Sequence, residues 1–137
     1  MIWVIDCSIA SALFLPDENS LNADKFFSSL GKKDILTVPV LWWYEFTNVL
    51  KVTIRRKRLS HIDAHKTVSL FQAMSIETDF IDAHDVQNLL ELSLLYNLSA
   101  YDAAYLDLAL RKNARLATLD QQLLDAATQA GITTNKR

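Results

Sequence analysis

The chain has 137 residues, half of them apolar, with one cysteine, two glycines and two prolines. This length suffices for a single domain, residues 1–137, whose core needs no disulfide to hold it. The lone Cys7 excludes an intrachain disulfide and fits a reducing compartment, so we expect a cytoplasmic protein. No apolar run approaches the roughly 20 residues that cross a bilayer, so no membrane contact is expected.

Short apolar runs alternate with helical patterns along the whole chain. In chain order we expect a strand at 1–5, a short helix capped by Ser8 and ended by Pro16, a helix from Ser20 to Leu30, a strand at 35–38 and a helix over 41–56. There follow a helix from Ser60 to Met74, a weak strand at 76–80, a helix from Asp82 or Ala83 to Tyr96, a helix over 99–112, a strand at 115–119, a helix over 120–130 and an edge strand at 132–134. This alternation predicts an α/β fold with a central, mainly parallel sheet and helices on both faces.

Four acidic residues stand where such a fold would turn them toward one site: Asp6, Glu45, Asp102 and Asp120. Asp6 and Asp120 follow expected strands, and open parallel sheets bind ligands at the carboxyl ends of their strands. Glu45 and Asp102 lie early in helices that could face the same crevice. Converging carboxylates repel one another and are costly to desolvate, so Mg²⁺ or Mn²⁺ is the natural compensation. The pattern favours a metal-dependent phosphodiester hydrolase.

Three of the acids also have a simpler, structural explanation. Asp6 and Asp120 could be caps at the start of helices, and Ser99-Ala-Tyr-Asp102 matches the capping-box pattern. Glu45 differs, because it interrupts an aromatic-rich segment in which an unpaired carboxylate would be expensive to bury. Asn48, three residues further on the same helical face, could orient Glu45 or a water.

A basic run follows Glu45 in the same expected helix. Lys51, Arg55, Arg56 and Arg58 fall within eight residues, although the net charge of the chain is −2. Taken alone, such a run is usually a solvated helix end, where cations suit the helix dipole. Beside an acidic phosphodiesterase site, contact with phosphates becomes the better explanation.

The segments around the four acids resemble the four motifs of PIN-domain nucleases, most closely the VapC-like toxin branch. They are Ile-Asp6-Cys-Ser, Trp-Tyr-Glu45-Phe-Thr-Asn-Val-Leu, Ser-Ala-Tyr-Asp102-Ala-Ala-Tyr-Leu and Ala-Thr-Leu-Asp120-Gln-Gln-Leu. Each motif is weak by itself, but four in this order within a chain of this size are fairly specific. The resemblance extends from Met1 to Thr134.

The resemblance implies a three-layer α/β/α sandwich, an endoribonuclease that depends on Mg²⁺ or Mn²⁺, and a homodimer. It also implies a small antitoxin protein as partner, whose tail blocks the site. The catalytic and metal-binding acids would be Asp6, Glu45, Asp102 and Asp120, with Ser8, Asn48 and Thr118 as supporting polar residues. Asp120 would bind metal directly or through water. The basic run would guide the RNA backbone.

Two other functions remain open from the sequence. In a receiver-like domain Asp6 would accept a phosphoryl group and Thr118 would be a switch residue, but the acidic pair and the late lysine that such a domain needs are missing. In a non-catalytic RNA- or protein-binding module the acids would be caps and surface groups. His61 and His65 share a helical face, yet no third ligand completes a zinc site.

Overall fold

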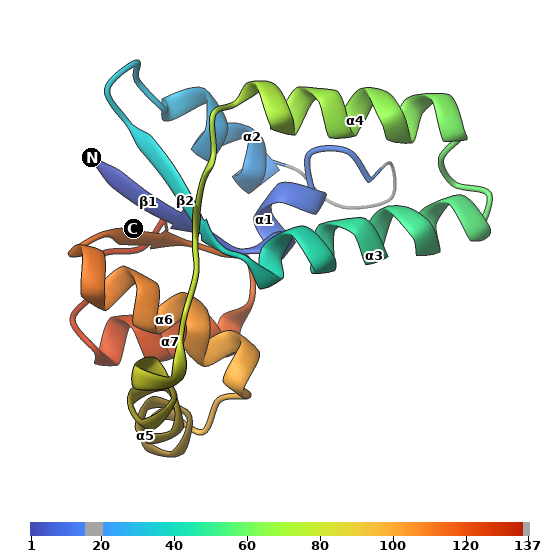
Figure 1. Ribbon diagram of the computed structural model, residues 1–137. Helices are drawn as coiled ribbons and strands as arrows, with labels where there is room; N and C mark the ends of the chain where they lie inside the picture. Colours follow the sequence, from blue (N-terminus) through green and yellow to red (C-terminus); the bar gives the residue numbers. More distant parts are fainter. Residues whose placement is uncertain (16–20, 136–137) are drawn as a thin grey trace.

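A four-stranded parallel sheet forms the centre of the computed structural model, which describes residues 1–15 and 21–135 (Figure 1). The strands are β1 (Ile2–Ile5), β2 (Ile35–Pro39), β3 (Glu77–Asp79) and β4 (Arg115–Ala117). They lie in the order β3-β2-β1-β4, and all three pairs are parallel. The expected parallel sheet is confirmed.

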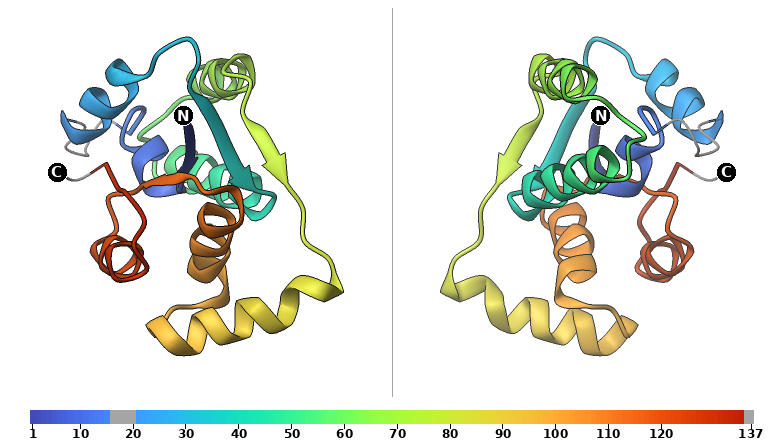
Figure 2. Two further views of the ribbon diagram at one scale, coloured as in Figure 1. Left: turned by 90° about the vertical axis from the view of Figure 1, so that its left-hand side faces the viewer. Right: turned by 90° about the vertical axis from the view of Figure 1, so that its right-hand side faces the viewer.

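Helices cover both faces of the sheet and complete three layers (Figures 1 and 2). One layer holds α1 (Cys7–Ser11), α2 (Leu21–Ser29), α3 (Leu41–Arg55) and α4 (His61–Ala73). The other holds the short 3₁₀ helix η1 (Ala83–Asp85), α5 (Val86–Tyr96), α6 (Ala100–Lys112) and α7 (Gln121–Gln129). Helix α6 packs directly on β1, β2 and β4. Within the described ranges, no helix is long and apolar enough to span a membrane.

The aromatic residues at the start of α3 lie partly in the core and partly on the surface. A helix turns consecutive side chains in different directions, so Trp42 is buried whereas Tyr44 is 75% exposed. Trp42 packs against Phe46, and Phe46 packs against Phe71 of α4, with ring centroids 5.0 Å apart in both pairs. These contacts hold α3 and α4 together as an antiparallel hairpin that extends past the sheet (Figure 1).

Two local expectations need correction. Asp6, not Ser8, caps α1, because the Asp6 carboxylate accepts the Ile9 N–H while Ser8 already lies inside the helix. Helix α1 ends at Ser11; Pro16, which was expected to end it, lies outside the described residues, as does Ser20.

The edge strand expected at 132–134 is reduced to an isolated parallel bridge between Leu116 and Thr134. The reason lies next to the bridge: the Thr118 N–H is taken by the Asn135 side chain at 2.9 Å, which ends the backbone ladder. The chain still runs beside β4, since the Leu116 N–H donates to the Thr133 carbonyl.

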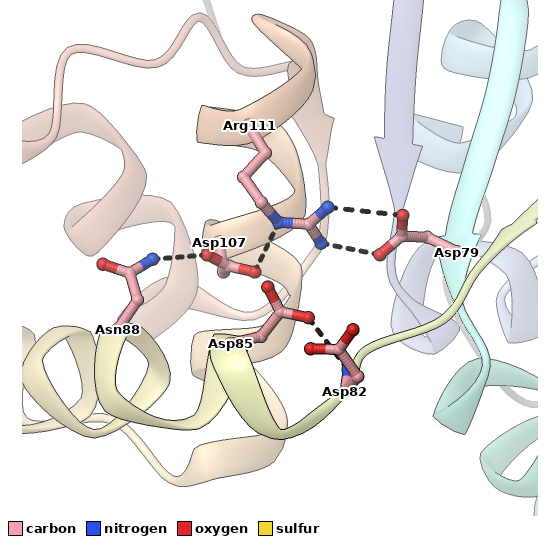
Figure 3. Close-up of polar contacts among 6 residues, drawn as sticks. All are labelled: Asp79, Asp82, Asp85, Asn88, Asp107 and Arg111. Carbon is pink, nitrogen blue, oxygen red and sulfur yellow. Dashed lines mark hydrogen bonds and ion pairs between the residues drawn. The ribbon is translucent and has the colours of Figure 1, made fainter.

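A polar network joins α5, α6 and the end of β3 (Figure 3). The Arg111 guanidinium donates to Asp107 through Nε at 2.8 Å and to Asp79 through Nη2 at 2.6 Å. Asn88 donates its amide to the other Asp107 oxygen at 2.6 Å. Because Asp107 is only 1% exposed, its charge depends on these donors, and the network ties the outer helix α5 to the sheet.

We predict that Arg111→Met lowers the free energy of unfolding by about 3 kcal/mol, because it leaves the buried Asp107 carboxylate without its cation. The neighbouring Lys112→Met removes the same charge type from an exposed position and should cost less than about 0.5 kcal/mol. Urea unfolding of both variants measures the difference. Equal effects would show that the network contributes nothing beyond surface charge.

Candidate active site

The carboxyl ends of β1 and β4 meet at one buried carboxylate, that of Asp6. Its backbone N–H donates to the Ala117 carbonyl at 3.2 Å, which joins the two strand ends. The Ser8 hydroxyl and the Ile9 N–H donate to Oδ1 at 2.7 and 3.2 Å, and the Thr118 hydroxyl donates to Oδ2. With 6% exposure and three donors, the Asp6 side chain has a fixed orientation.

The hydroxyls of Ser8 and Thr118 also connect the turns that follow the two strands. Ser8 Oγ accepts the Leu119 N–H at 2.9 Å, and Thr118 Oγ1 accepts the Asp120 N–H at 3.0 Å. The two hydroxyl oxygens are 3.3 Å apart. Asp120 itself caps α7 by accepting the Leu123 N–H at 3.0 Å. One hydrogen-bonded group therefore sets the positions of Asp6 and Asp120 together.

The other two acids come from helices in opposite layers. Glu45 lies in the second turn of α3, and Asp102 lies in the first turn of α6, where its N–H donates to the capping Ser99 hydroxyl at 3.1 Å. Both side chains are half-buried. The Tyr105 hydroxyl, one turn after Asp102, donates to Glu45 Oε1 and so bridges the two layers.

The charges of neighbouring acids act on one another, so the four acids lie near each other in pairs. The pKa of Asp6 is raised to about 6, chiefly by burial and in small part by the charge of Asp120, against the opposing effect of its three donors. Burial and the charge of Asp102 raise the pKa of Glu45. Burial and the charge of Asp120 raise the pKa of Asp102. The predicted residues thus form a continuous acidic cluster, Asp6–Asp120–Asp102–Glu45.

Cys7, beside Asp6, is a packed thiol and not a nucleophile. Burial and the charges of Glu45 and Asp6 raise its pKa to about 12, so the thiolate is absent at neutral pH.

A hard cation fits this cluster by the chemistry of its donors. Carboxylate and hydroxyl oxygens are the ligands that Mg²⁺ and Mn²⁺ take. Among the described residues, no basic side chain forms an ion pair with any of the four acids. No three described Asp, Glu, His or Cys side chains already surround one point as ligands would. The cluster is acidic and uncompensated, but open.

Several other predicted residues are exposed. Asn48 is exposed, and the hydrogen bond to Glu45 comes from Tyr105 instead. The basic run lies at the far end of α3: Arg55 is ten residues from Glu45, or about 15 Å along a helix axis. His61 and His65 are exposed on α4 and belong to no metal-binding group within the described residues.

Tyr105 is the site residue that the sequence analysis missed. It is 2% exposed, and burial together with the Glu45 hydrogen bond raises its pKa far above the ordinary tyrosine value, so its hydroxyl remains a donor. A signal for it did exist: a tyrosine in the apolar stretch of α6 needs a partner for its hydroxyl, and Asp102 three residues earlier marks the face it lies on.

Comparison with known proteins assigns the family. The family model of the PIN domain matches residues 3–129, and the chain belongs to the PIN-domain family. Ribonuclease VapC3 of Pyrobaculum aerophilum is 30% identical over 129 residues, which cover 91% of this chain and 94% of the relative. The family predicted from the four motifs is confirmed, and the receiver-like alternative is excluded.

Solved structures share the fold over nearly the full length of both chains. The Mycobacterium tuberculosis toxin VapC20, which cleaves the sarcin-ricin loop, superposes with a TM-score of 0.68 at 16% identity over 97% of each chain. A toxin–antitoxin complex from Klebsiella pneumoniae gives a TM-score of 0.66 at 18% identity over 98% of each chain. The three-layer α/β/α architecture is therefore that of toxin PIN domains.

The burial of Asp6 predicts how the stability of the metal-free protein depends on pH. A folded-state pKa near 6, above the ordinary value of 3.8, means that folding favours the protonated acid. The contribution of Asp6 is therefore present below about pH 4 and is lost as pH rises through 6. We expect the free energy of unfolding to fall by a few kcal/mol across this window.

Asp6→Asn separates this effect from that of the other acids. The amide oxygen still accepts the Ile9 N–H, and no charge is buried at high pH. Denaturant unfolding in EDTA at pH 4.5 and pH 7.5 should show the variant more stable than the wild type only at the higher pH. A constant difference between the two proteins would contradict the burial cost assigned to Asp6.

Proposed function

We propose that this protein is a metal-dependent endoribonuclease that hydrolyses RNA phosphodiester bonds with Mg²⁺ or Mn²⁺, and that it is the toxin of a type II toxin–antitoxin pair. The carrying observation is the group of four acids at the carboxyl edge of the sheet, held by hydrogen bonds from Ser8, Thr118 and Tyr105 and, among the described residues, in no ion pair with a basic side chain. The name of the relative Ribonuclease VapC3 supports RNA as the substrate.

The four acids would have different roles in metal binding, because their surroundings differ. When bound, a divalent cation supplies positive charge for the phosphate and lowers the pKa of a bound water. Asp6 would be the fixed ligand, since Ser8 and Thr118 hold its orientation. Glu45 and Asp102 would complete the ligand set from α3 and α6. Asp120 is exposed, which suits contact through water as well as direct binding.

The basic run would bind RNA away from the reacting phosphate. Lys51, Arg55, Arg56 and Arg58 are all exposed along α3 and the turn after it. At about 15 Å from Glu45, Arg55 would meet the backbone a few nucleotides from the cleavage position, because consecutive phosphates are several ångströms apart. Such contacts position the strand and carry little sequence information.

Two protein partners belong to the proposal. A second copy would bind through an apolar stripe on α5, where Val86, Leu90 and Leu94 are exposed at four-residue spacing on one face. In the aromatic run at 42–46, Tyr44 is exposed and Trp43 is half-buried, whereas Trp42 and Phe46 lie in the core. The toxin–antitoxin complex of the same fold supports an antitoxin as the other partner. The proposed place of action is the cytoplasm.

We predict cleavage of single-stranded and structured RNA in Mn²⁺ or Mg²⁺, with complete loss in EDTA and recovery when metal is restored. Asp6→Asn should lower cleavage by about 100-fold or more, because even a residue that only supports a metal ligand is worth 10- to 100-fold. Asp125→Asn, an exposed acid on α7 that Gln121 contacts, is the matched control and should retain activity. Full activity in excess EDTA would overturn the metal-dependent mechanism.

For the basic run, we predict weaker RNA binding when Lys51, Arg55, Arg56 and Arg58 are all changed to Gln. Binding should weaken on every RNA sequence, and the plot of log affinity against log salt should flatten by about 0.7 for each phosphate that no longer pairs with a cationic side chain. The control changes Lys25, Lys32, Lys33 and Lys112 to Gln, which removes the same charge elsewhere. Binding is measured in the Asp6→Asn background. Equal slopes for the two variants would reassign the run to plain surface charge.

A further inference from the structure

Among the described residues, one side chain donates a hydrogen bond to the Glu45 carboxylate, and it comes from the opposite layer of the fold. Tyr105 lies on α6 and donates its hydroxyl to Glu45 Oε1, across 60 positions of sequence. In the described part of the chain no other hydrogen bond reaches this carboxylate. Asp6, by comparison, has three donors.

The backbone leaves Glu45 less constrained than the other acids. Asp6 and Asp120 cap helices just after β1 and β4, and Asp102 lies in the helical turn that Ser99 caps. Glu45 lies in the second turn of α3, and its longer side chain has one more rotatable bond than an aspartate. A half-buried glutamate therefore needs a side-chain partner if it is to keep one orientation.

Tyr105 suits this role because its own position is fixed. It is 2% exposed within α6, in a stretch from Ala103 to Ala109 that is buried throughout. It is also three residues after Asp102, so the two side chains lie on the same helical face. Helix α6 thus carries Asp102 and, one turn later, Tyr105, which donates the hydrogen bond that holds Glu45.

We propose that Tyr105 is a positioning residue, which acts through Glu45 to hold that carboxylate where it binds the divalent cation. This inference rests on the proposed metal-dependent function. Partners of this kind, one step removed from the metal, orient the ligand and typically change metal affinity or activity by 10- to 100-fold when they are removed. Tyr105 itself touches neither the metal nor the RNA.

The test compares Tyr105→Phe with Tyr101→Phe. Both changes remove one hydroxyl from α6, but Tyr101 is 68% exposed, and among the described residues its hydroxyl donates to none of the four acids. Calorimetric titration with Mn²⁺ should show about 10- to 100-fold weaker binding to Tyr105→Phe and unchanged binding to Tyr101→Phe. The kcat for RNA cleavage should fall by a similar factor while KM stays the same, because the RNA contacts are intact.

A double-mutant cycle separates positioning from packing. If Tyr105 acts through Glu45, adding Tyr105→Phe to Glu45→Gln should weaken Mn²⁺ binding no further. A packing role predicts the opposite pattern, in which the thermal midpoint falls in both backgrounds and Mn²⁺ affinity does not change. Additive losses of affinity in the cycle would overturn the proposal.

A third measurement uses only the wild-type Tyr105 and does not depend on folding of the variant. In protein labelled at the tyrosine ring Cζ, the Tyr105 resonance should shift as Mg²⁺ saturates, because its acceptor oxygen then faces a cation. The chain has four tyrosines, so the signal is assigned by elimination with Tyr44→Phe, Tyr96→Phe and Tyr101→Phe. A Tyr105 signal unmoved at saturation would overturn the proposal.

These outcomes distinguish the positioning role from the function on which it rests. If the wild type neither binds Mn²⁺ nor cleaves RNA, the proposed function fails and the positioning role fails with it. If the wild type does both, and Tyr105→Phe matches Tyr101→Phe in Mn²⁺ affinity and kcat, only the positioning role is overturned.

Discussion

The buried Asp6 carboxylate is the constraint on which the site depends. Two donors come from α1, which follows β1, and one comes from the turn after β4, so the charge cannot be satisfied until these strands lie side by side. The parallel register then fixes where α1 and α7 begin. A charge that is costly to bury therefore specifies the arrangement of the sheet edge, and that edge carries the acids.

The acids serve the fold and the candidate site at the same time. Asp6 and Asp120 cap α1 and α7, and Asp102 lies in the first turn of α6, where the partial positive charge of a helix N-terminus favours an anion. Capping and site membership are therefore compatible explanations of the same residue. The helix N-termini offset part of the repulsion within the cluster, and a cation would offset the rest.

Local patterns predicted most of the elements, because apolar periodicity and capping residues act over a few positions. The acids could be brought together from sequence because parallel strands collect their carboxyl ends at one edge. Partnerships between distant side chains could not. The hydrogen bond between Tyr105 and Glu45 spans 60 positions, and the ion pair between Arg111 and Asp79 spans 32. Nothing in the local sequence of a tyrosine or an arginine indicates which distant acid it will contact. The cap of α1 was misassigned for a related reason, since Asp6 and Ser8 are both good capping residues and only the backbone decides between them.

The pairing of β1 with β4 has a consequence for synthesis on the ribosome. Asp6 is made before its partners, since Thr118 and Asp120 follow it by more than 110 residues. Asp6 can form these contacts only after β4 has been made, because closing so long a loop costs conformational entropy that no native contact offsets before then. A nascent chain that ends before Asp120 lacks part of the acidic cluster and holds Asp6 without its Thr118 donor. Under the proposed function, this order of assembly would keep the acidic cluster incomplete, and the chain inactive, until nearly the whole fold has formed.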